Sequence, residues 1–206
     1  MHVRDAGSSE IRELVARAKQ GDREAFDLLV ERYTPQVYNL VFRITGSREE
    51  AEDCVQDAFL RAFSALRKFR GEAAFSTWLY RVAVNVANDA ARRLSGQALR
   101  ASELANPYSG EDAPDLDRFA REASRQTDGP EQVLVERQRR DVILRAIRSL
   151  PEHHRTVVVL YDLQGFSYEQ IARILGARVG TVKSRLNRAR VALKELLAPH
   201  LELLRD

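Results

Sequence analysis

Apolar residues recur three and four positions apart between residues 10 and 45, which is the spacing of an amphipathic helix. The pattern breaks at Gly21 and ends at Gly46, so we expect helices on both sides of Gly21. Proline suits the first turn of a helix, and Pro35 therefore predicts a further helix start within this stretch. The amino-terminal segment is thus expected to be a run of short helices.

Two longer helices follow. Ser47 with Glu50 three residues later matches a capping box and predicts a helix, which Gly71 ends. A further helix is expected from about Ser76 to Leu94, with apolar residues available for packing.

Residues 95–130 differ in composition, with three glycines, three prolines and an acidic excess, which is typical of a linker. Helical spacing returns at residue 131 and stops at Pro151. The apolar run VVVLY at 157–161 is assigned to a helix because its neighbours are helical. The sequence thus predicts an all-α protein of three parts: a helical domain at 1–94, a flexible acidic linker at 95–130 and a helical domain at 131–206.

The composition narrows the class of protein. The chain has 206 residues, and its longest apolar run, VVVLY, is far shorter than the ~20 residues of a membrane-spanning helix. The first residues lack the apolar stretch of a secretory signal. Cys54 is the single cysteine, which excludes an internal disulfide and predicts a small buried residue, with a redox-sensitive thiol as the alternative. We therefore expect a soluble cytoplasmic protein with no membrane insertion.

No residue pattern points to catalysis. His153 and His154 are adjacent rather than four positions apart, so they do not indicate a metal site. We find neither a phosphate-cradling glycine loop nor a nucleophile and base at recognisable spacing. We expect no catalytic residue, no metal, no cofactor and no enzymatic activity.

The formal net charge is +3, but the charged residues are unevenly distributed along the chain. Residues 173–194 hold seven basic and no acidic side chains, and residues 61–93 hold seven basic and two acidic ones. Stretches of one sign favour a polyanionic partner. A solvated helix face is the alternative for either stretch, but two basic stretches on either side of an acidic spacer favour nucleic acid.

The basic stretch at residues 173–194 lies in a segment with the packing pattern of a helix-turn-helix. Ser167 and Gln170 form a capping box that opens a short helix at 168–175. Gly176 supplies the turn, and a second helix runs from about residue 180 to 197. Small and apolar residues, Ala172 and Val182 among them, stand where the two helices must cross.

The helical wheel leaves polar and basic side chains on the outer face of the second helix. Short polar side chains and arginine suit base edges in the major groove, and lysine suits phosphates. The alternative is an ordinary helical hairpin with a soluble face. The outward and flanking residues are Thr181, Lys183, Ser184, Arg185, Asn187 and Arg188.

Aromatic and basic residues alternate between residues 69 and 93, where Phe69, Phe75 and Trp78 lie near several arginines. Aromatic faces among cations suit the unstacked bases of a single strand. The alternative for each aromatic residue taken alone is a place in the core.

Residues 52–85 and 149–193 resemble extracytoplasmic-function (ECF) sigma factors of the sigma-70 family, in the sigma-E-like branch. The resemblance implies a sigma-2 domain, a linker and a sigma-4 domain. It implies binding to RNA polymerase core enzyme through the beta-prime clamp helices and the beta flap, together with promoter recognition and DNA opening. It also implies an anti-sigma partner and a role in a stress or envelope response.

The resemblance also assigns residues. It places polymerase docking on the helix that holds Asp53, Gln56, Asp57 and Arg61. It places Arg178 and three residues of the outward face, Lys183, Ser184 and Arg188, at the minus-thirty-five element. The loop 69–75 would hold a flipped base of the minus-ten element, next to a reading helix. The expected minus-ten residues are Phe69, Arg70, Phe75, Thr77, Trp78, Arg81, Asn85, Asn88 and Asp89.

Two other classes of function stay open on the sequence. One is an autonomous helix-turn-helix regulator whose first domain senses a ligand or dimerises. The other is a protein-interaction adaptor, which leaves the two basic stretches unexplained. Residues 52–93 favour the sigma factor, because they combine an expected docking helix with an aromatic and basic segment.

Overall fold

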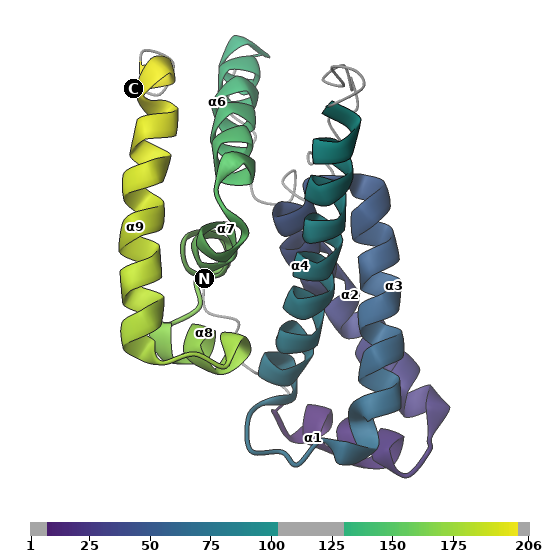
Figure 1. Cartoon of the computed structure of the whole chain (residues 1–206). Coiled ribbons are helices and arrows are strands. Elements are labelled where there is room, and N and C mark those ends of the chain that lie inside the picture. The colour runs from purple at the N-terminus through teal and green to yellow at the C-terminus, as the bar shows by residue number, and fades with distance from the viewer. Residues whose placement is uncertain (1–7, 103–129, 202–206) are drawn as a thin grey trace.

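The computed structural model describes residues 8–102 and 130–201, and every regular element in these two ranges is helical (Figure 1). The all-α prediction is therefore confirmed for the described residues. Most of the predicted linker, residues 103–129, lies outside them.

The first domain consists of α1 (Ser8–Lys19), α2 (Arg23–Thr45), α3 (Arg48–Ala65), the short 3-10 helix η1 (Leu66–Lys68) and α4 (Phe75–Ser102). Helices α2, α3 and α4 pack against one another, and α1 crosses their lower end (Figure 1). Apolar residues at helical spacing fill the space between them, with Leu29, Leu40 and Leu79 almost fully buried. Ser47 accepts a hydrogen bond from the Glu50 amide at 3.4 Å and begins α3 as predicted.

Helix α2 runs through Pro35 without interruption, so the predicted helix start at this residue is wrong. Proline lacks the backbone donor that would bond the carbonyl oxygen of residue 31. The hydroxyl of the neighbouring Thr34 donates to the Val30 carbonyl oxygen (2.7 Å) and adds a hydrogen bond in the same turn. Buried residues on both sides of the proline, such as Leu29 and Val37, hold the two halves against α3 and α4. Tertiary packing here outweighs the local preference.

Helix α4 continues to Ser102, beyond residue 94 where we expected the linker to begin. The glycine at position 96 does not end the helix. The residue boundaries predicted for the two domains stay a prediction.

The second domain consists of α6 (Pro130–Ser149), α7 (Glu152–Val158), a π-helical turn η2 (Val159–Leu163), α8 (Tyr168–Leu175), α9 (Val179–Leu197) and η3 (Ala198–His200). The apolar run 157–161 is helical, as predicted from its neighbours, and its first four residues are buried. The π-helical turn within it is a feature that periodicity did not predict.

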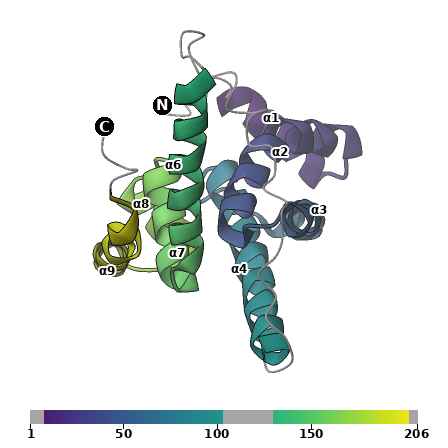
Figure 2. The ribbon, with the colours of Figure 1, turned by 90° about the horizontal axis from the view of Figure 1, so that it is seen from above.

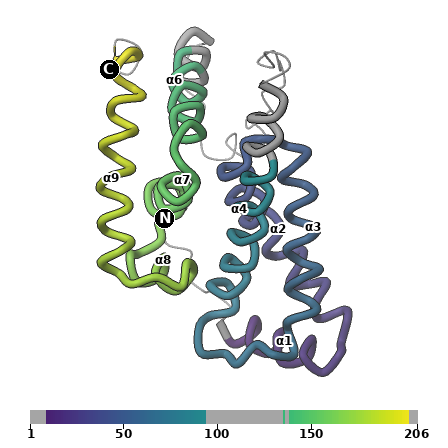
Figure 3. The backbone as a smooth tube through the Cα atoms, viewed as in Figure 1, coloured from purple at the N-terminus to yellow at the C-terminus, as the bar shows by residue number. Residues whose placement is uncertain are grey.

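The two domains lie side by side and touch. Helix α4 packs on α8 and α7, and the carboxyl end of α2 meets α6, α7 and η2. Seen from above, α3 and α9 lie on opposite sides, with α7 and α2 between them (Figure 2). The tube in Figure 3 shows the same order from α9 through α7 and α4 to α3. Hydrophobic periodicity did not predict this contact between the domains.

Candidate nucleic-acid and polymerase interfaces

An aromatic cluster joins the start of α4 to the loop before it. The ring centroids of Phe69 and Trp78 are 5.1 Å apart, and those of Phe75 and Trp78 are 5.7 Å apart. Phe75 is buried and also packs on Tyr33 of α2, whereas Phe69 and Trp78 are only partly buried. Lys19 fixes the loop by donating to the Phe69 carbonyl oxygen at 2.8 Å. The cluster is therefore core on one side and accessible on the other.

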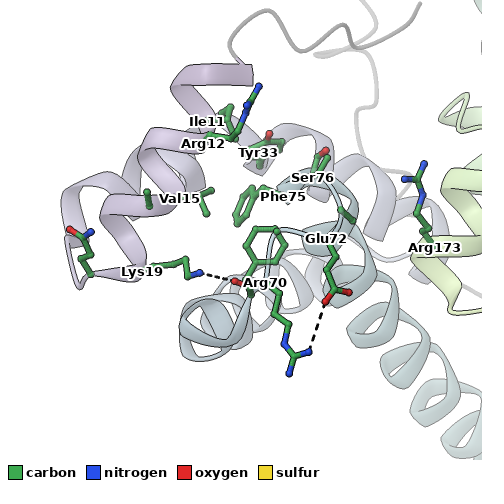
Figure 4. Close-up of a pocket in the computed structure, with 16 residues that line it drawn as sticks. Ile11, Arg12, Val15, Lys19, Tyr33, Arg70, Glu72, Phe75, Ser76 and Arg173 are labelled. Carbon is green, nitrogen blue, oxygen red and sulfur yellow. Dashed lines mark hydrogen bonds and ion pairs between the residues drawn. The ribbon is translucent and has the colours of Figure 1, made fainter.

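A cavity of about 710 Å³ opens beside this loop (Figure 4). Phe69 and Phe75 provide its aromatic wall, and Ile11 and Val15 of α1 provide an aliphatic one. One acidic side chain, Glu72, lines the cavity and lies 3.9 Å from Arg70 (Figure 4). Basic side chains from three elements surround the apolar walls. They are Arg12 and Lys19 of α1, Arg70 of the loop and Arg173 of α8. An apolar hollow bordered by cations is suited to a planar ring that carries a phosphate.

The residues predicted to read the minus-ten element have different environments along α4. Arg81 and Asn85 are exposed and Thr77 is partly buried. Asn88 already has a hydrogen-bond partner, because its Oδ1 accepts a hydrogen bond at 2.9 Å from the hydroxyl of Thr156 in the second domain. Thr156 itself is only 2 % exposed.

A chain of ion pairs runs across the molecule from α3 to α7. Arg61 binds Asp57 through two hydrogen bonds of 3.0 and 2.7 Å and lies 3.9 Å from Asp89. Asp89 pairs with Arg92 at 2.6 Å, and Arg92 pairs with Glu152 of α7 at 3.2 Å. A residue predicted to bind DNA, Asp89, is thereby linked to two residues predicted to bind the polymerase.

The predicted docking residues share one face of α3. Asp53, Gln56 and Arg61 are exposed, and Asp57 is partly buried. The same face continues into Leu60, whose side chain is 61 % exposed and lines a shallow hollow with Ser64 and Lys68. Sequence reasoning missed this apolar residue, although its spacing from Asp53 and Asp57 places it on that face.

The helix-turn-helix has the predicted local geometry. Ser167 Oγ accepts from the Gln170 amide at 3.2 Å, and the Gln170 side chain accepts from the Ser167 amide at 2.8 Å, which completes the capping box. Gly176 ends α8 in the left-handed region, at φ 61° and ψ 34°. Val182 is buried where α8 and α9 cross.

The outer face of α9 is mostly as predicted. Arg178 before the helix is also exposed, and Thr181 is partly buried. Arg185 departs from the prediction because it is partly buried, near His154 of α7. The exposed positions on α9 are Lys183, Ser184, Asn187 and Arg188.

Two tyrosines support α9 from the side. The rings of Tyr161 and Tyr168 stack, with centroids 4.7 Å apart and planes inclined by 15°. The Lys183 ammonium lies 5.4 Å from the centre of the Tyr168 ring, and the Arg190 guanidinium lies 5.2 Å from the centre of the Tyr161 ring. Arg190 also pairs with Asp162. Sequence reasoning missed this support, because the π-helical turn that positions Tyr161 and Asp162 has no clear sequence signal.

Cys54 is buried, as predicted. Burial is the main cause that raises the pKa of its thiol to about 11, and the nearby Glu50 carboxylate adds to the effect. The thiolate is therefore scarce at neutral pH, which makes the thiol unreactive.

Comparison with known proteins identifies the two domains. Residues 29–97 match Sigma-70 region 2, and residues 140–193 match Sigma-70 region 4. The chain is 42 % identical over 187 residues to the ECF RNA polymerase sigma-E factor of Escherichia coli strain K12, covering 90 % of this chain and 93 % of that one. The chain is an ECF sigma factor.

One further relative and two solved structures are similar to this chain. The RNA polymerase sigma-H factor of Pseudomonas aeruginosa is 38 % identical over 188 residues, covering 91 % of this chain and 93 % of that one. The sigma factor RpoE from Bartonella quintana, solved in complex with the anti-sigma factor NepR, superposes with a TM-score of 0.59 at 25 % identity, covering 84 % of this chain and 96 % of that one. CnrH, solved with the cytosolic domain of CnrY, shares the fold, with a TM-score of 0.62 at 24 % identity over 91 % of this chain and 97 % of that one.

As an ECF sigma factor, the chain acts in promoter-directed initiation of transcription, and the family resemblance found in the sequence is confirmed. The two matched regions correspond to the two helical domains, which we now call the sigma-2 and sigma-4 domains. Within the described ranges, no helix is both long and apolar enough to span a membrane, and no group of three metal-ligating side chains occurs.

Proposed function

We propose that this protein binds RNA polymerase core enzyme through α3, reads the minus-ten element with the aromatic loop and α4, and reads the minus-thirty-five element with α9. It acts in the cytoplasm as a binding subunit, with no bond chemistry of its own. DNA opening then requires only that binding of the unpaired strand offsets the cost of unstacking a base.

The observation that carries the proposal is the cavity beside the aromatic loop. Its volume of about 710 Å³ falls within the range of roughly 300–1,000 Å³ that is usual for small-molecule sites. A flipped base can stack on the accessible side of Phe69, while Lys19 and Arg70 lie where the backbone phosphates would pass.

The α3 face supports polymerase docking. It combines an exposed leucine, Leu60, with acidic and basic neighbours, and an apolar anchor within a polar rim is the usual composition of a protein interface. The opposite side of α3 packs on α2 and α4 of the sigma-2 domain. The proposed docking face of α3 therefore needs no rearrangement before it binds the polymerase.

The exposed face of α9 supports duplex recognition. Ser184 and Arg188 lie one turn apart and point away from the buried residues Val182 and Leu186. Arginine forms paired hydrogen bonds with guanine, and Lys183 is placed to contact phosphate.

Further partners follow from the relatives. The Bartonella RpoE complex contains an anti-sigma factor, and we propose a partner of this class for the present chain. The sigma-4 domain would in addition contact the beta flap of the polymerase. The expected setting is a stress or envelope response.

Run-off transcription from a promoter library, with and without the protein, tests the proposal. Purified core enzyme should produce transcripts from a defined set of two-element promoters only when the protein is added. Binding to duplex DNA without initiation would instead favour an autonomous regulator.

A paired charge reversal tests the docking face. The variant D53R/D57R should abolish holoenzyme assembly, because it reverses two acidic side chains at the expected interface, while duplex binding by α9 is retained. The control E13R/E31R reverses two exposed glutamates on α1 and α2 and should assemble normally. Normal assembly of D53R/D57R would remove α3 from the proposal.

A further inference from the structure

The loop between η1 and α4 is largely open to solvent. Arg70, Gly71, Glu72 and Ala74 are exposed, and the ion pair between Arg70 and Glu72 lies at the surface. Gly71 turns the chain in the left-handed region, at φ 75°, with nothing near the position of a Cβ. An exposed segment that contains glycine loses much conformational entropy when it is held in one shape. The shape of this loop therefore depends on how its ends are held.

Phe69, at the beginning of the loop, is held through its ring and through both of its backbone polar groups. The ring packs on Phe75 and Trp78, with centroids 6.0 and 5.1 Å away. Its amide donates to the Leu66 carbonyl oxygen at 3.0 Å, at the end of η1. Its carbonyl oxygen accepts a hydrogen bond from the Lys19 ammonium of α1 at 2.8 Å (Figure 4). Lys19 thus joins α1 to the residue that precedes the exposed turn.

The corner between α1 and α2 fixes where Lys19 lies. Asp22 caps α2, and its Oδ1 accepts from the Ala25 amide at 3.0 Å. Its Oδ2 accepts from the Arg17 Nε at 2.8 Å, so one carboxylate joins the last turn of α1 to the first turn of α2. The hydrogen bond from the Ala25 amide and the bond from Arg17 both lower the pKa of Asp22. Lys19 therefore projects from a corner that is itself hydrogen-bonded.

Lys19 differs from Arg70, the cation that follows Phe69 in the chain. Arg70 is exposed, whereas the Lys19 side chain is partly buried and already donates to a carbonyl oxygen. Lysine has three donors, so a contact with phosphate is the alternative role for Lys19. The bond to Phe69 favours an indirect role, because a binding surface that already has its bound shape loses less entropy when the ligand arrives.

We propose that Lys19 is a positioning residue for the unpaired minus-ten strand: its hydrogen bond to the Phe69 carbonyl oxygen holds the aromatic loop in the shape that accepts a base. This inference rests on the proposed function of the loop and deepens it. It gives a part in strand capture to α1, which contains none of the residues expected to read the minus-ten element.

Variants of the full chain at position 19 test this role. K19M keeps most of the apolar stem and removes the donor, whereas K19R keeps a donor at the same position. The matched control is R23M, which removes an exposed cation near the same corner. Circular dichroism checks that each variant is folded, and K19A takes the place of K19M if K19M does not fold.

Trp78 reports on the loop in the absence of DNA. It is the single tryptophan of the chain, and its ring packs on Phe69. If the tie from α1 holds the loop, acrylamide should quench the fluorescence of Trp78 more strongly in K19M than in the native chain. K19R and R23M should be quenched like the native chain.

Strand binding is the second measurement, with a short fluorescein-labelled DNA single strand of random sequence as the probe. K19M should bind this strand ~5-fold more weakly, which is the order expected for the loss of one hydrogen bond. K19R should recover most of the native affinity, and R23M should bind nearly as tightly as the native chain. The salt dependence of K19M should equal that of the native chain, because no phosphate contact is lost. Affinity for a duplex of random sequence should be unchanged.

A folded K19M variant with native quenching and native strand affinity would overturn the proposal. A slope of log affinity against log salt that is smaller by about 0.7 in K19M would also overturn it, because that change marks a lost phosphate contact. If K19R does not recover the affinity, the packing of the lysine stem is responsible and the hydrogen bond is not. A native chain that does not bind the strand removes the proposed function of the loop, whereas native binding that K19M leaves unchanged removes only the role of Lys19.

Discussion

The two regions that we propose to read DNA are built in different ways. On α9 the proposed reading side chains stand on the exposed side of one helix, and the opposite side packs into the sigma-4 domain. On the sigma-2 side, the proposed reading surface combines a loop, the start of α4 and a wall from α1, and one of its residues, Asn88, is hydrogen-bonded by the other domain.

This difference explains why one region was easier to predict. A helical wheel separates the faces of α9 because that separation depends on local spacing only. The aromatic region depends on which ring is buried by other helices. Phe75 is buried and Phe69 is partly buried, although the two residues stand only six positions apart in the sequence. Distinguishing these rings experimentally sharpens the comparison.

The largest expected effect is on stability, at Phe75. Removing this buried ring in F75A should lower the free energy of unfolding by about 3–5 kcal/mol, as for other buried aromatic residues. Urea unfolding followed by fluorescence measures the effect in the sigma-2 domain, because Trp78 is the single tryptophan. The control F69A removes the partly buried ring of the same cluster and should cost clearly less. Equal costs would show that the aromatic cluster is not divided into core and accessible sides.

The next effect is on duplex recognition by α9. R188A should weaken binding to the minus-thirty-five element by about 1–3 kcal/mol and relax base preference at the contacted position. Competition binding against a library of duplexes measures both changes. K194A, which removes an exposed lysine further along α9, should leave base preference unchanged. If R188A weakens all duplexes equally, Arg188 contacts phosphate and the assignment to a base edge is wrong.

A matched pair of glycines tests the domain contact. Gly46 and Gly71 both lie in the left-handed region, at φ 78° and 75°. An alanine in this region costs roughly 1–2 kcal/mol. G71A should cost only that amount because nothing lies near its Cβ, whereas G46A should cost more because it also displaces Arg148. Thermal unfolding of both variants gives the difference, and equal losses would mean that the Arg148 contact contributes nothing to stability.

The smallest effect is a pH dependence at His154, near the reading helix. Burial lowers the pKa of His154 in the folded protein, and the charges of His153, Arg188 and Arg185 lower it further. Between this lowered pKa and the unfolded value of about 6.5, the unfolded chain binds more protons, so stability should fall as the pH falls through this window. Urea unfolding at pH 7.5 and 5.5 measures the loss. H154N should reduce it, and the control H200N at an exposed position should not. A loss that is the same in H154N would assign the dependence to other groups.

Local sequence determined the helices, the N-cap at Ser47, the capping box at Ser167, the left-handed turn at Gly176 and the outward face of α9. At Ser47 only half of the predicted capping box forms, because Ser47 accepts from the Glu50 amide without a return bond from the Glu50 side chain. Each of these depends on interactions within about four residues, which is why spacing alone predicts them. The resemblance to ECF sigma factors added the order of the domains.

Only the tertiary structure decided the rest. Packing between helices keeps α2 continuous through Pro35 and places residues of α1 beside the aromatic loop, where they line the cavity. It also brings Tyr161 and Asp162 into contact with Arg190. It also joined Asn88 to Thr156, which are 68 residues apart along the chain. Such contacts depend on how separately formed helices pack, and no spacing within one helix records which surface of another it will meet.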